Sequence, residues 1–230
     1  MNINPIYYRN ISPNFGHKSE QKNPYSLNDR LKVAACTALG VGTSLAILAK
    51  NAKTPQGKSY SLNPFKMFKN IKKSYLANVK FEMKEVISIG AGTCFGGLFG
   101  GYLIDKNKDN REAKRREAVM QFGNISIPIA TVHYCSKLTE KYGKIAQSVG
   151  SVGGIFAGVF LANFLMNKLS NRLFENKNER GVKATDFAAH LDDAIVAAGY
   201  ISDAPLVQKI GRLVPVALMV AGNEVGNKTA

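Results

Sequence analysis

The residues best suited to chemistry lie close together near the end of the chain, in and just before the stretch FAAHLDDAIVAAGYI (187–201). Asp186, His190 and Asp193 are spaced four and three residues apart, so a helix places them on one face. Two carboxylates and an imidazole can bind an ion or pass a proton, and ionisable residues at membrane depth are candidates for function. The sequence therefore predicts a candidate ion or proton site here, to which His133 from another apolar segment is added.

Asp186 also has a structural interpretation. Thr185 is a suitable N-cap residue, and it would place Asp186 in the first turn of a helix, where a carboxylate stabilises the helix N-terminus. On this interpretation Asp186 is part of a helix start and not of a site.

A second structural interpretation concerns Asp193. The segment after it has a turn signal at residues 202–203 and continues as an apolar helix, which predicts an antiparallel helical hairpin over residues 184–230. In that register Asp193 lies level with Arg212, and Lys183 lies level with Glu224. We expect Asp193 and Arg212 to form an ion pair that fixes the register of the two helices. His190 alone has no structural explanation in the sequence.

The elements that would position these residues are long uncharged segments. Four runs of 17, 19, 19 and 23 residues contain no Asp, Glu, Lys or Arg: 33–49, 86–104, 118–136 and 145–167. About 20 apolar residues in a helix span a hydrocarbon core about 30 Å thick. The fold class predicted is therefore all-α, a polytopic membrane protein with four Gly/Ala-rich hydrophobic helices and the C-terminal helical hairpin.

The alternative fold is a soluble helical bundle with Ala- and Gly-rich core helices, which the mean hydropathy of −0.11 favours slightly. A soluble surface helix carries charged residues every third or fourth position on its wet face. These four runs carry none around their whole circumference, so the membrane interpretation is preferred.

Small residues recur every four positions in three of the runs and predict close helix packing. In lipid there is little hydrophobic force between helices, so close backbone approach along such stripes supplies van der Waals contact instead. The stripes favour packing within the chain or between copies of a homo-oligomer. Their members are Ala38, Gly42 and Ala46 in the first run, Gly92, Gly96 and Gly100 in the second, and Gly150, Gly154 and Gly158 in the fourth.

The third run contains a proline in its centre. Pro128 has no backbone N–H, so the carbonyl of Asn124 loses its helical donor and a kink is expected. Broken helices with polar side chains form midplane sites in many transporters, whereas a proline kink that neighbouring helices stabilise is commoner. Gln121 and His133 lie on the same run.

Positive charge collects in the connections. A basic amphipathic helix is expected over residues 60–84, between the first two runs, lying on a membrane surface. The rest of the chain divides into a disordered polar tail (1–31), the membrane helix bundle (32–168, which includes this connection) and a basic linker (169–183) before the hairpin. Lysines of the connection are predicted to contact anionic lipid head groups: Lys66, Lys69, Lys72, Lys73 and Lys80.

Other functional classes find little support. The net charge of +15 comes without zinc-ligand spacing, an RNP-like pattern or a recognition helix, so no nucleic-acid partner is predicted. The three cysteines lie in separate apolar runs and indicate neither a disulfide framework nor a metal site. No cofactor is expected, and no nucleophile and base occur at an informative spacing.

The function expected is that of an integral, multi-pass membrane protein without catalytic activity, which packs helices, oligomerises or organises the membrane. The distribution of Lys and Arg over the loops favours a cytoplasmic N-terminus. Two alternatives remain open: a small cation or proton-coupled transporter or channel that uses His190 and Asp193, and a membrane-inserting pore-forming protein.

Overall fold

The computed structural model describes residues 24–53, 60–61, 75, 82–174, 179–188, 190 and 213–230. In this part of the chain the regular elements are all helical, which confirms the all-α prediction. Three of the helices, α1, α4 and α6, are long and apolar enough to cross a membrane. The elements are α1 (Leu27–Asn51), α4 (Met83–Ile104), α5 (Lys108–Thr139), the 3-10 turn η2 (Glu140–Tyr142), α6 (Lys144–Leu173), α7 (Ala184–Ala188) and α10 (Val214–Gly226).

Helix α1 begins inside the segment that the sequence assigned to a disordered tail ending at residue 31. Ser26 is its N-cap, and the Ser26 hydroxyl accepts a hydrogen bond from the backbone N–H of Asp29 at 3.2 Å. This cap satisfies a donor that the first turn leaves free. The helix therefore starts at Leu27, several residues before the uncharged run.

Helix α5 likewise begins in a segment expected to be a connection, residues 105–117. The Asn107 side chain accepts hydrogen bonds from the backbone N–H groups of Asp109 and Asn110, at 2.8 and 3.2 Å, and so caps the helix. The residues that follow are mostly Lys, Arg, Glu and Ala, which favour helix. Only residues 105–107 remain as a turn, and α5 is about 48 Å long at 1.5 Å per residue. In the same way α6 extends to Leu173, into the predicted linker 169–183.

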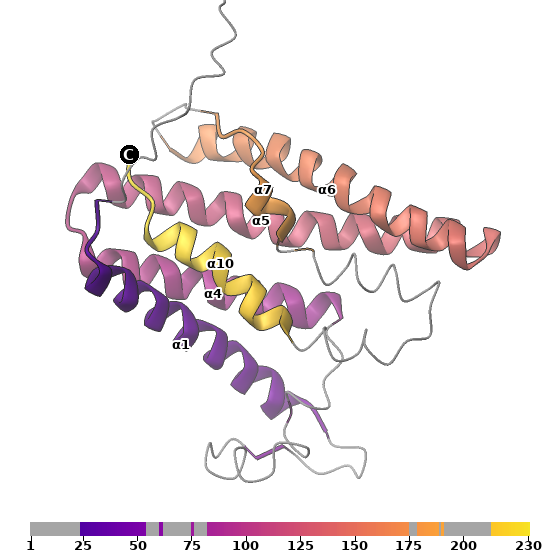
Figure 1. The fold of residues 1–230 in the computed structure, drawn as a ribbon, viewed down its shortest axis with the longest axis horizontal. Helices are drawn as coiled ribbons and strands as arrows, with labels where there is room; N and C mark the ends of the chain where they lie inside the picture. Colours follow the sequence, from indigo (N-terminus) through magenta and orange to yellow (C-terminus); the bar gives the residue numbers. More distant parts are fainter. Residues whose placement is uncertain are drawn as a thin grey trace, which may run out of the picture.

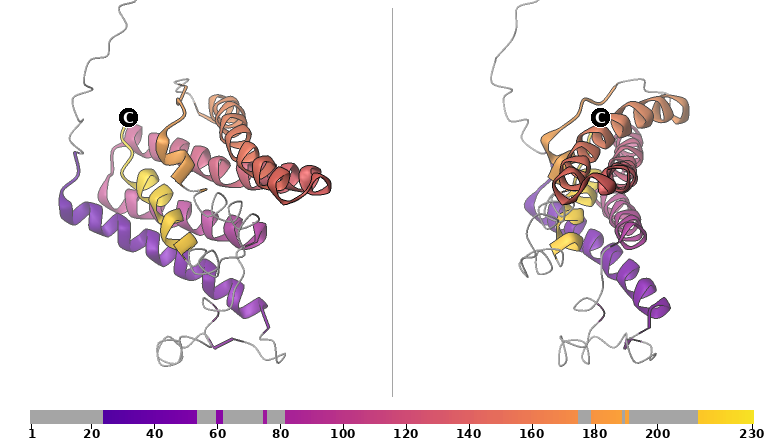
Figure 2. Two further views of the ribbon diagram at one scale, coloured as in Figure 1. Left: turned by 45° about the vertical axis from the view of Figure 1, so that its right-hand side comes forward. Right: turned by 90° about the vertical axis from the view of Figure 1, so that its right-hand side faces the viewer.

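The helices pack in a simple order, which Figures 1 and 2 show. Helix α4 lies between α1 and α5, and it is antiparallel to both. Helices α5 and α6 form a long antiparallel hairpin, joined at Gly143, whose φ of 100° lies in the left-handed region that glycine tolerates. Helix α10 lies against α4, α1 and α5. The short helix α7 lies across α5 and α6.

Glycines mark the closest approaches between these helices. A methyl group added to any of Gly92, Gly96 or Gly100 would overlap α1, and one added to Gly150, Gly154 or Gly158 would overlap α5. A second pair on α4, Gly97 and Gly101, meets Gly222 and Gly226 of α10 in the same way. Backbones in van der Waals contact leave no room for a side chain, so these glycines are required by packing.

The stripe predicted on α1 points elsewhere. Gly42 has no atom within 4 Å of an added methyl group, and Ala38 and Ala46 are exposed. Gly40 meets Gly92 of α4 instead. Among the described residues Ala38, Gly42 and Ala46 therefore do not pack within the chain, because α1 has small residues on more than one face and spacing alone does not choose between the faces. Packing of this stripe between copies stays a prediction.

One end of the bundle gathers four distant segments, at the left of Figure 1. The Nζ of Lys114 in α5 donates to the carbonyl of Lys228 at 2.5 Å, and the Tyr25 hydroxyl donates to Asp105. The Arg116 guanidinium donates to the side chain of Asn171, near the end of α6, at 3.1 Å. The start of α1, the α4–α5 turn, the end of α6 and residue 228 therefore lie together.

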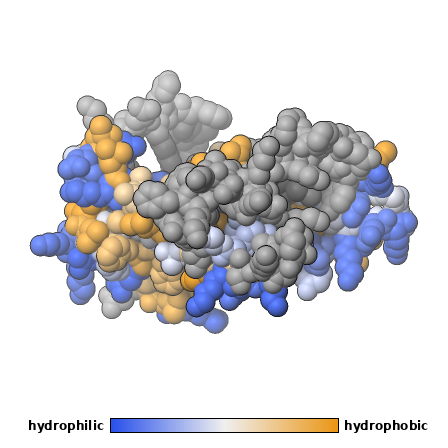
Figure 3. All heavy atoms as spheres, turned by 90° about the horizontal axis from the view of Figure 1, so that it is seen from below, coloured by the Kyte–Doolittle hydropathy of each residue, from blue (hydrophilic) through white to orange (hydrophobic). Residues whose placement is uncertain are grey.

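The outer surface carries many large apolar side chains. Leu39 is 71% exposed, Phe95 73% and Phe160 59%, on α1, α4 and α6 respectively. In Figure 3 such residues form a patch bordered by hydrophilic residues at the left edge of the view. The interior, in contrast, contains charged and amide side chains: Lys114, Glu117, Gln121, Asn124, Asn167 and Asp186 are buried. Buried charged side chains beside the apolar core, together with large exposed apolar side chains, are unusual for a soluble protein.

Several predicted features lie outside the described residues. These are the ion pair of Asp193 with Arg212, the hairpin turn at residues 202–203, most of the basic connection 60–84, and five lysines predicted to contact lipid: Lys66, Lys69, Lys72, Lys73 and Lys80.

Candidate polar site in the bundle

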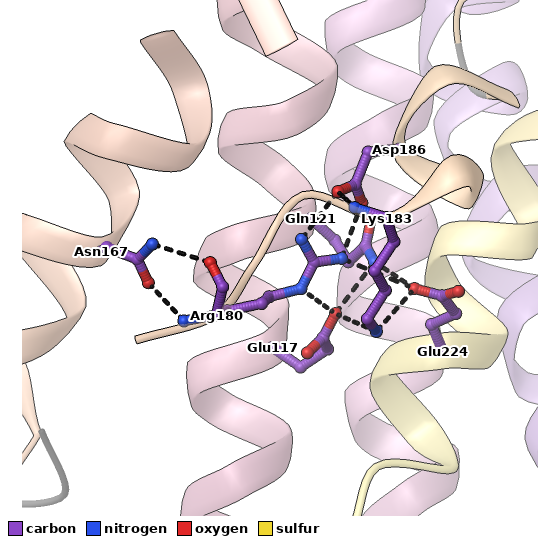
Figure 4. A network of polar contacts seen from close by, with 7 residues as sticks. All are labelled: Glu117, Gln121, Asn167, Arg180, Lys183, Asp186 and Glu224. Atoms are coloured by element: carbon purple, nitrogen blue, oxygen red, sulfur yellow. Dashed lines mark hydrogen bonds and ion pairs between the residues drawn. The ribbon is translucent and has the colours of Figure 1, made fainter. Parts of the chain in front are cut away.

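Arg180, in the segment between α6 and α7, is the centre of a buried charge network (Figure 4). Its guanidinium donates two hydrogen bonds to the carboxylate of Asp186, at 2.8 and 2.6 Å, and one to Glu117 of α5 at 3.1 Å. Glu224 of α10 lies 3.8 Å away. The Arg180 side chain is only 9% exposed, so these carboxylates replace its hydration.

The neighbouring helices hold Arg180 and its partners in place. Asn167 of α6 binds the backbone of Arg180 on both sides, accepting from its N–H and donating to its carbonyl, each at 2.9 Å. On α5, Gln121 lies one turn after Glu117 and donates to Glu117 at 2.9 Å and to Glu224 at 2.5 Å. Four helices, α5, α6, α7 and α10, and one loop therefore meet at this network.

Two cations and three carboxylates make up the network. The Nζ of Lys183 lies 3.8 Å from Glu117 and 3.6 Å from Glu224. The predicted hairpin register also places Lys183 level with Glu224. Burial alone would lower the pKa of Arg180, but the bond to Asp186 and the charges of Glu117 and Glu224 raise it above its usual value. Arg180 therefore stays charged, and the network has an excess of one negative charge.

Asp186 lies at a helix start, as the structural interpretation predicted. It falls in the first turn of α7, and its carboxylate accepts a hydrogen bond from the backbone N–H of Lys183 at 2.8 Å. The cap itself was assigned wrongly: α7 begins at Ala184, so Thr185 lies inside the helix. Two bonds to Arg180 and one to the backbone already occupy Asp186.

His190 lies in the interior against the part of α5 that contains Pro128. The Nε2 of His190 lies 2.6 Å from the carbonyl oxygen of Asn124, the group that Pro128 leaves without a helical donor. His190 is 1% exposed. With a proton on Nε2, the imidazole donates the hydrogen bond that the missing N–H of Pro128 cannot. The fold thus gives His190 a structural role that the sequence did not reveal.

This contact predicts a thermodynamic coupling. Replacing His190 with Leu leaves a buried carbonyl unsatisfied, so the free energy of unfolding should fall by about 1–3 kcal/mol. In a Pro128→Ala background the helix regains its own donor, and the same His190→Leu change should cost at least about 1 kcal/mol less. Unfolding of the four proteins in detergent measures the coupling. Equal costs in both backgrounds would show that His190 does not compensate for the proline.

His133 does not join His190. It is exposed on α5, nine residues beyond Asn124, and its ring packs edge-on against Tyr134 with 5.9 Å between ring centroids. Asp186 and His190 also bind different partners, Arg180 and the Asn124 carbonyl. The four-residue ion or proton site predicted from spacing is therefore not assembled from Asp186, His190 and His133, and Asp193 lies outside the described residues.

A second polar cluster joins the segments at the bundle end. Lys114 is fully buried, and its Nζ donates to the Tyr25 hydroxyl at 2.7 Å and lies 3.7 Å from the carboxylate of Asp105. Burial and the adjacent Asp105 raise the pKa of Tyr25, which keeps the phenol protonated as a donor. Burial alone would raise the pKa of Asp105, but bonds from Tyr25, Asn107 and Asn110 and the charge of Lys114 hold it below its usual value.

The Asp105 cluster predicts acid sensitivity. Because the pKa of Asp105 is lower in the folded than in the unfolded state, its contribution to stability is present above the unfolded pKa of about 3.9. That contribution is lost as the pH falls through the folded pKa. The thermal unfolding midpoint, measured from pH 6 to 3, should drop below about pH 4. The Asp105→Asn variant should be less stable at pH 6, and its midpoint should depend less on pH. If the midpoint depended on pH equally in the original protein and in Asp105→Asn, Asp105 would not be the cause of the acid sensitivity.

A cavity of about 630 Å³ opens beside the network, lined among others by Glu112, Glu117, Glu179 and Arg180. Within the described ranges, no group of three or more His, Cys, Asp or Glu side chains is arranged to hold a metal ion.

Three residues of the polar clusters were not predicted from the sequence: Arg180, Glu117 and Lys114. Glu117 and Gln121 are four residues apart at the edge of the third apolar run, and this spacing was an available signal for a polar stripe on α5. Nothing in the sequence marked Arg180 among the charges of the linker, because its partners come from three distant elements.

The architecture defines a class only: a helical protein with three helices able to span a membrane. No protein-family model, curated protein or solved structure matches the chain.

Proposed function

We propose that this chain is an integral, multi-pass membrane protein without catalytic activity, which acts as a helix-packing and membrane-organising component. In this proposal α1, α4, α5 and α6 cross the bilayer, and α7 and α10 complete the bundle. Helix α10, with 13 residues and a length of about 20 Å, is too short to cross a core about 30 Å thick.

The observation that carries the proposal is the distribution of side chains on α6. Its outward face bears Phe156, Phe160 and Phe164, all more than half exposed, whereas its buried residues are mostly small or polar, with Ile155 and Val159 as the larger apolar ones. Water disfavours such a surface, and patches larger than a few hundred Å² on soluble monomers mark interaction sites. Lipid acyl chains are the partner that suits a surface of this kind along several helices.

Four crossings bring the start of α1 and residue 228 to one side of the membrane and the η2 turn to the other. A single cysteine at Lys108 and one at Lys141, in a chain whose three cysteines are replaced by serine, should react with an impermeant maleimide from opposite sides of sealed vesicles. Labelling of both from the same side would contradict the proposed crossings.

A cation or proton-coupled transporter is the second candidate, and it is favoured by the contact of His190 with the Asn124 carbonyl, which Pro128 leaves without a helical donor. Irregular backbone lining a polar interior is how transporters bind ions. Vesicles that contain the purified chain and a pH-sensitive dye distinguish the two functions. Proton movement driven by a cation gradient and abolished in a folded His190→Gln variant supports transport; no movement supports the packing role.

A further inference from the structure

Asn124 is a buried side chain with unused hydrogen-bonding capacity. It is 1% exposed, and neither its Oδ1 nor its Nδ2 has a hydrogen-bond partner within the described part of the chain. An unsatisfied buried polar group costs about 1–3 kcal/mol, so most such groups in folded proteins have a partner, including water or ions. An unpartnered amide one turn before Pro128 therefore indicates a site for a ligand.

A second amide lies level with Asn124. Gly158 of α6 packs against Pro128, and Met166 packs against Gly123 of α5. Asn163 lies between these two contacts on α6, as Asn124 does on α5. The Oδ1 of Asn163 is also buried, and it has no partner among the residues that the structure describes.

The oxygens available here suit a hard cation. They are the side-chain oxygens of Asn124 and Asn163 and the Asn124 carbonyl, which binds His190 through one lone pair and retains a second. Carbonyl and amide oxygens are ligands of hard cations, and carbonyls freed by a broken helix coordinate ions such as Na⁺ in transporters.

The net charge of the Arg180 network favours an ion with a single positive charge. Gln121, three residues before Asn124 on α5, binds both Glu117 and Glu224 of the charge network. That network pairs two cations with three carboxylates, so its excess is one negative charge. A divalent ion such as Ca²⁺ takes six to eight oxygens, commonly with carboxylates among them, whereas the oxygens of Asn124 and Asn163 belong to neutral groups.

We propose that a monovalent metal cation binds beside the Pro128 segment of α5, between Asn124 and Asn163, and that water completes its coordination. The excess negative charge of the Arg180 network attracts the ion. Binding stabilises the contact between α5 and α6 and does not require that the protein transport the ion.

Thermal unfolding of the full chain in detergent tests the site directly. The midpoint is compared in NaCl, KCl, LiCl and choline chloride at equal ionic strength and pH. At ten times its dissociation constant, a bound metal ion should raise the midpoint by about 3–6 °C relative to choline. Asn124→Leu should abolish this difference, and Asn51→Leu, at the exposed end of α1, should retain it.

Equal midpoints in all four salts would overturn the proposal, as would a metal-ion effect that persists in Asn124→Leu. If Asn124→Leu does not fold, Asn124→Asp decides, because it keeps the size and adds a negative charge. A larger metal-ion effect in Asn124→Asp supports the site, and an unchanged effect overturns it. Because no membrane is present, the result is independent of the vesicle experiments.

Discussion

Replacing Arg180 with Met should destabilise the protein by about 3–5 kcal/mol, the cost of leaving buried charges without their partner. Glu117 and Asp186 are almost fully buried, and Arg180 binds both. Methionine keeps much of the side-chain volume, so the loss reports the charge and the hydrogen bonds. Chemical or thermal unfolding in detergent measures it. The packing of α5, α6 and α10 around Arg180 should loosen first, because the network joins these helices.

Arg172→Met is the matched control. Arg172 lies in the last turn of α6 and is exposed, so its loss should change stability by less than about 0.5 kcal/mol. Adding Glu117→Gln to Arg180→Met removes one of the unpaired carboxylates and should recover part of the stability. Similar losses in Arg172→Met and Arg180→Met would show that the network does not stabilise the fold.

The second large effect is expected at Gly158. Any side chain there would overlap the Cα of Pro128 and the hydroxyl of Thr131, and the first of these belongs to backbone that cannot rotate away. Gly158→Leu should therefore separate α5 from α6 and cost about 3 kcal/mol or more. The free energy of unfolding in detergent gives the cost, and cross-linking between cysteines placed on the two helices reports the separation.

Gly153→Leu is the control on the same helix. Gly153 is exposed, and an added methyl group there meets nothing within 4 Å. Because leucine favours helix over glycine, Gly153→Leu should be neutral or slightly stabilising. The two substitutions are the same chemical change five residues apart, so a comparable loss at both positions would contradict the packing of α6 on α5.

Local patterns in the sequence were sufficient to predict the helices but not always their limits. The uncharged runs mark α1, α4 and α6 because a spanning helix has no wet face. The uncharged runs do not predict the start of α5, because its first three turns are charged and resemble a connection between helices. Asn107 caps that helix through its own side chain, and an Asn at this position is a sequence signal for a helix start.

Residues of the polar site could be predicted only where their role depends on a single helix. Pro128 indicated that the carbonyl of Asn124 lacks a donor, and the sequence also left His190 without a partner. Nothing in the spacing joined the two, which are 66 residues apart. Arg180 depends on contacts from α5, α6, α7 and α10 together, and such a set follows from tertiary packing and not from periodicity.

The central claim is that the apolar outer faces of these helices contact lipid. Extraction of membranes with alkaline carbonate tests it most directly, because high pH removes peripheral proteins and leaves proteins whose helices span the bilayer. We predict that the full chain stays in the membrane pellet. Its release into the supernatant would contradict the membrane-spanning account and both functions proposed from it.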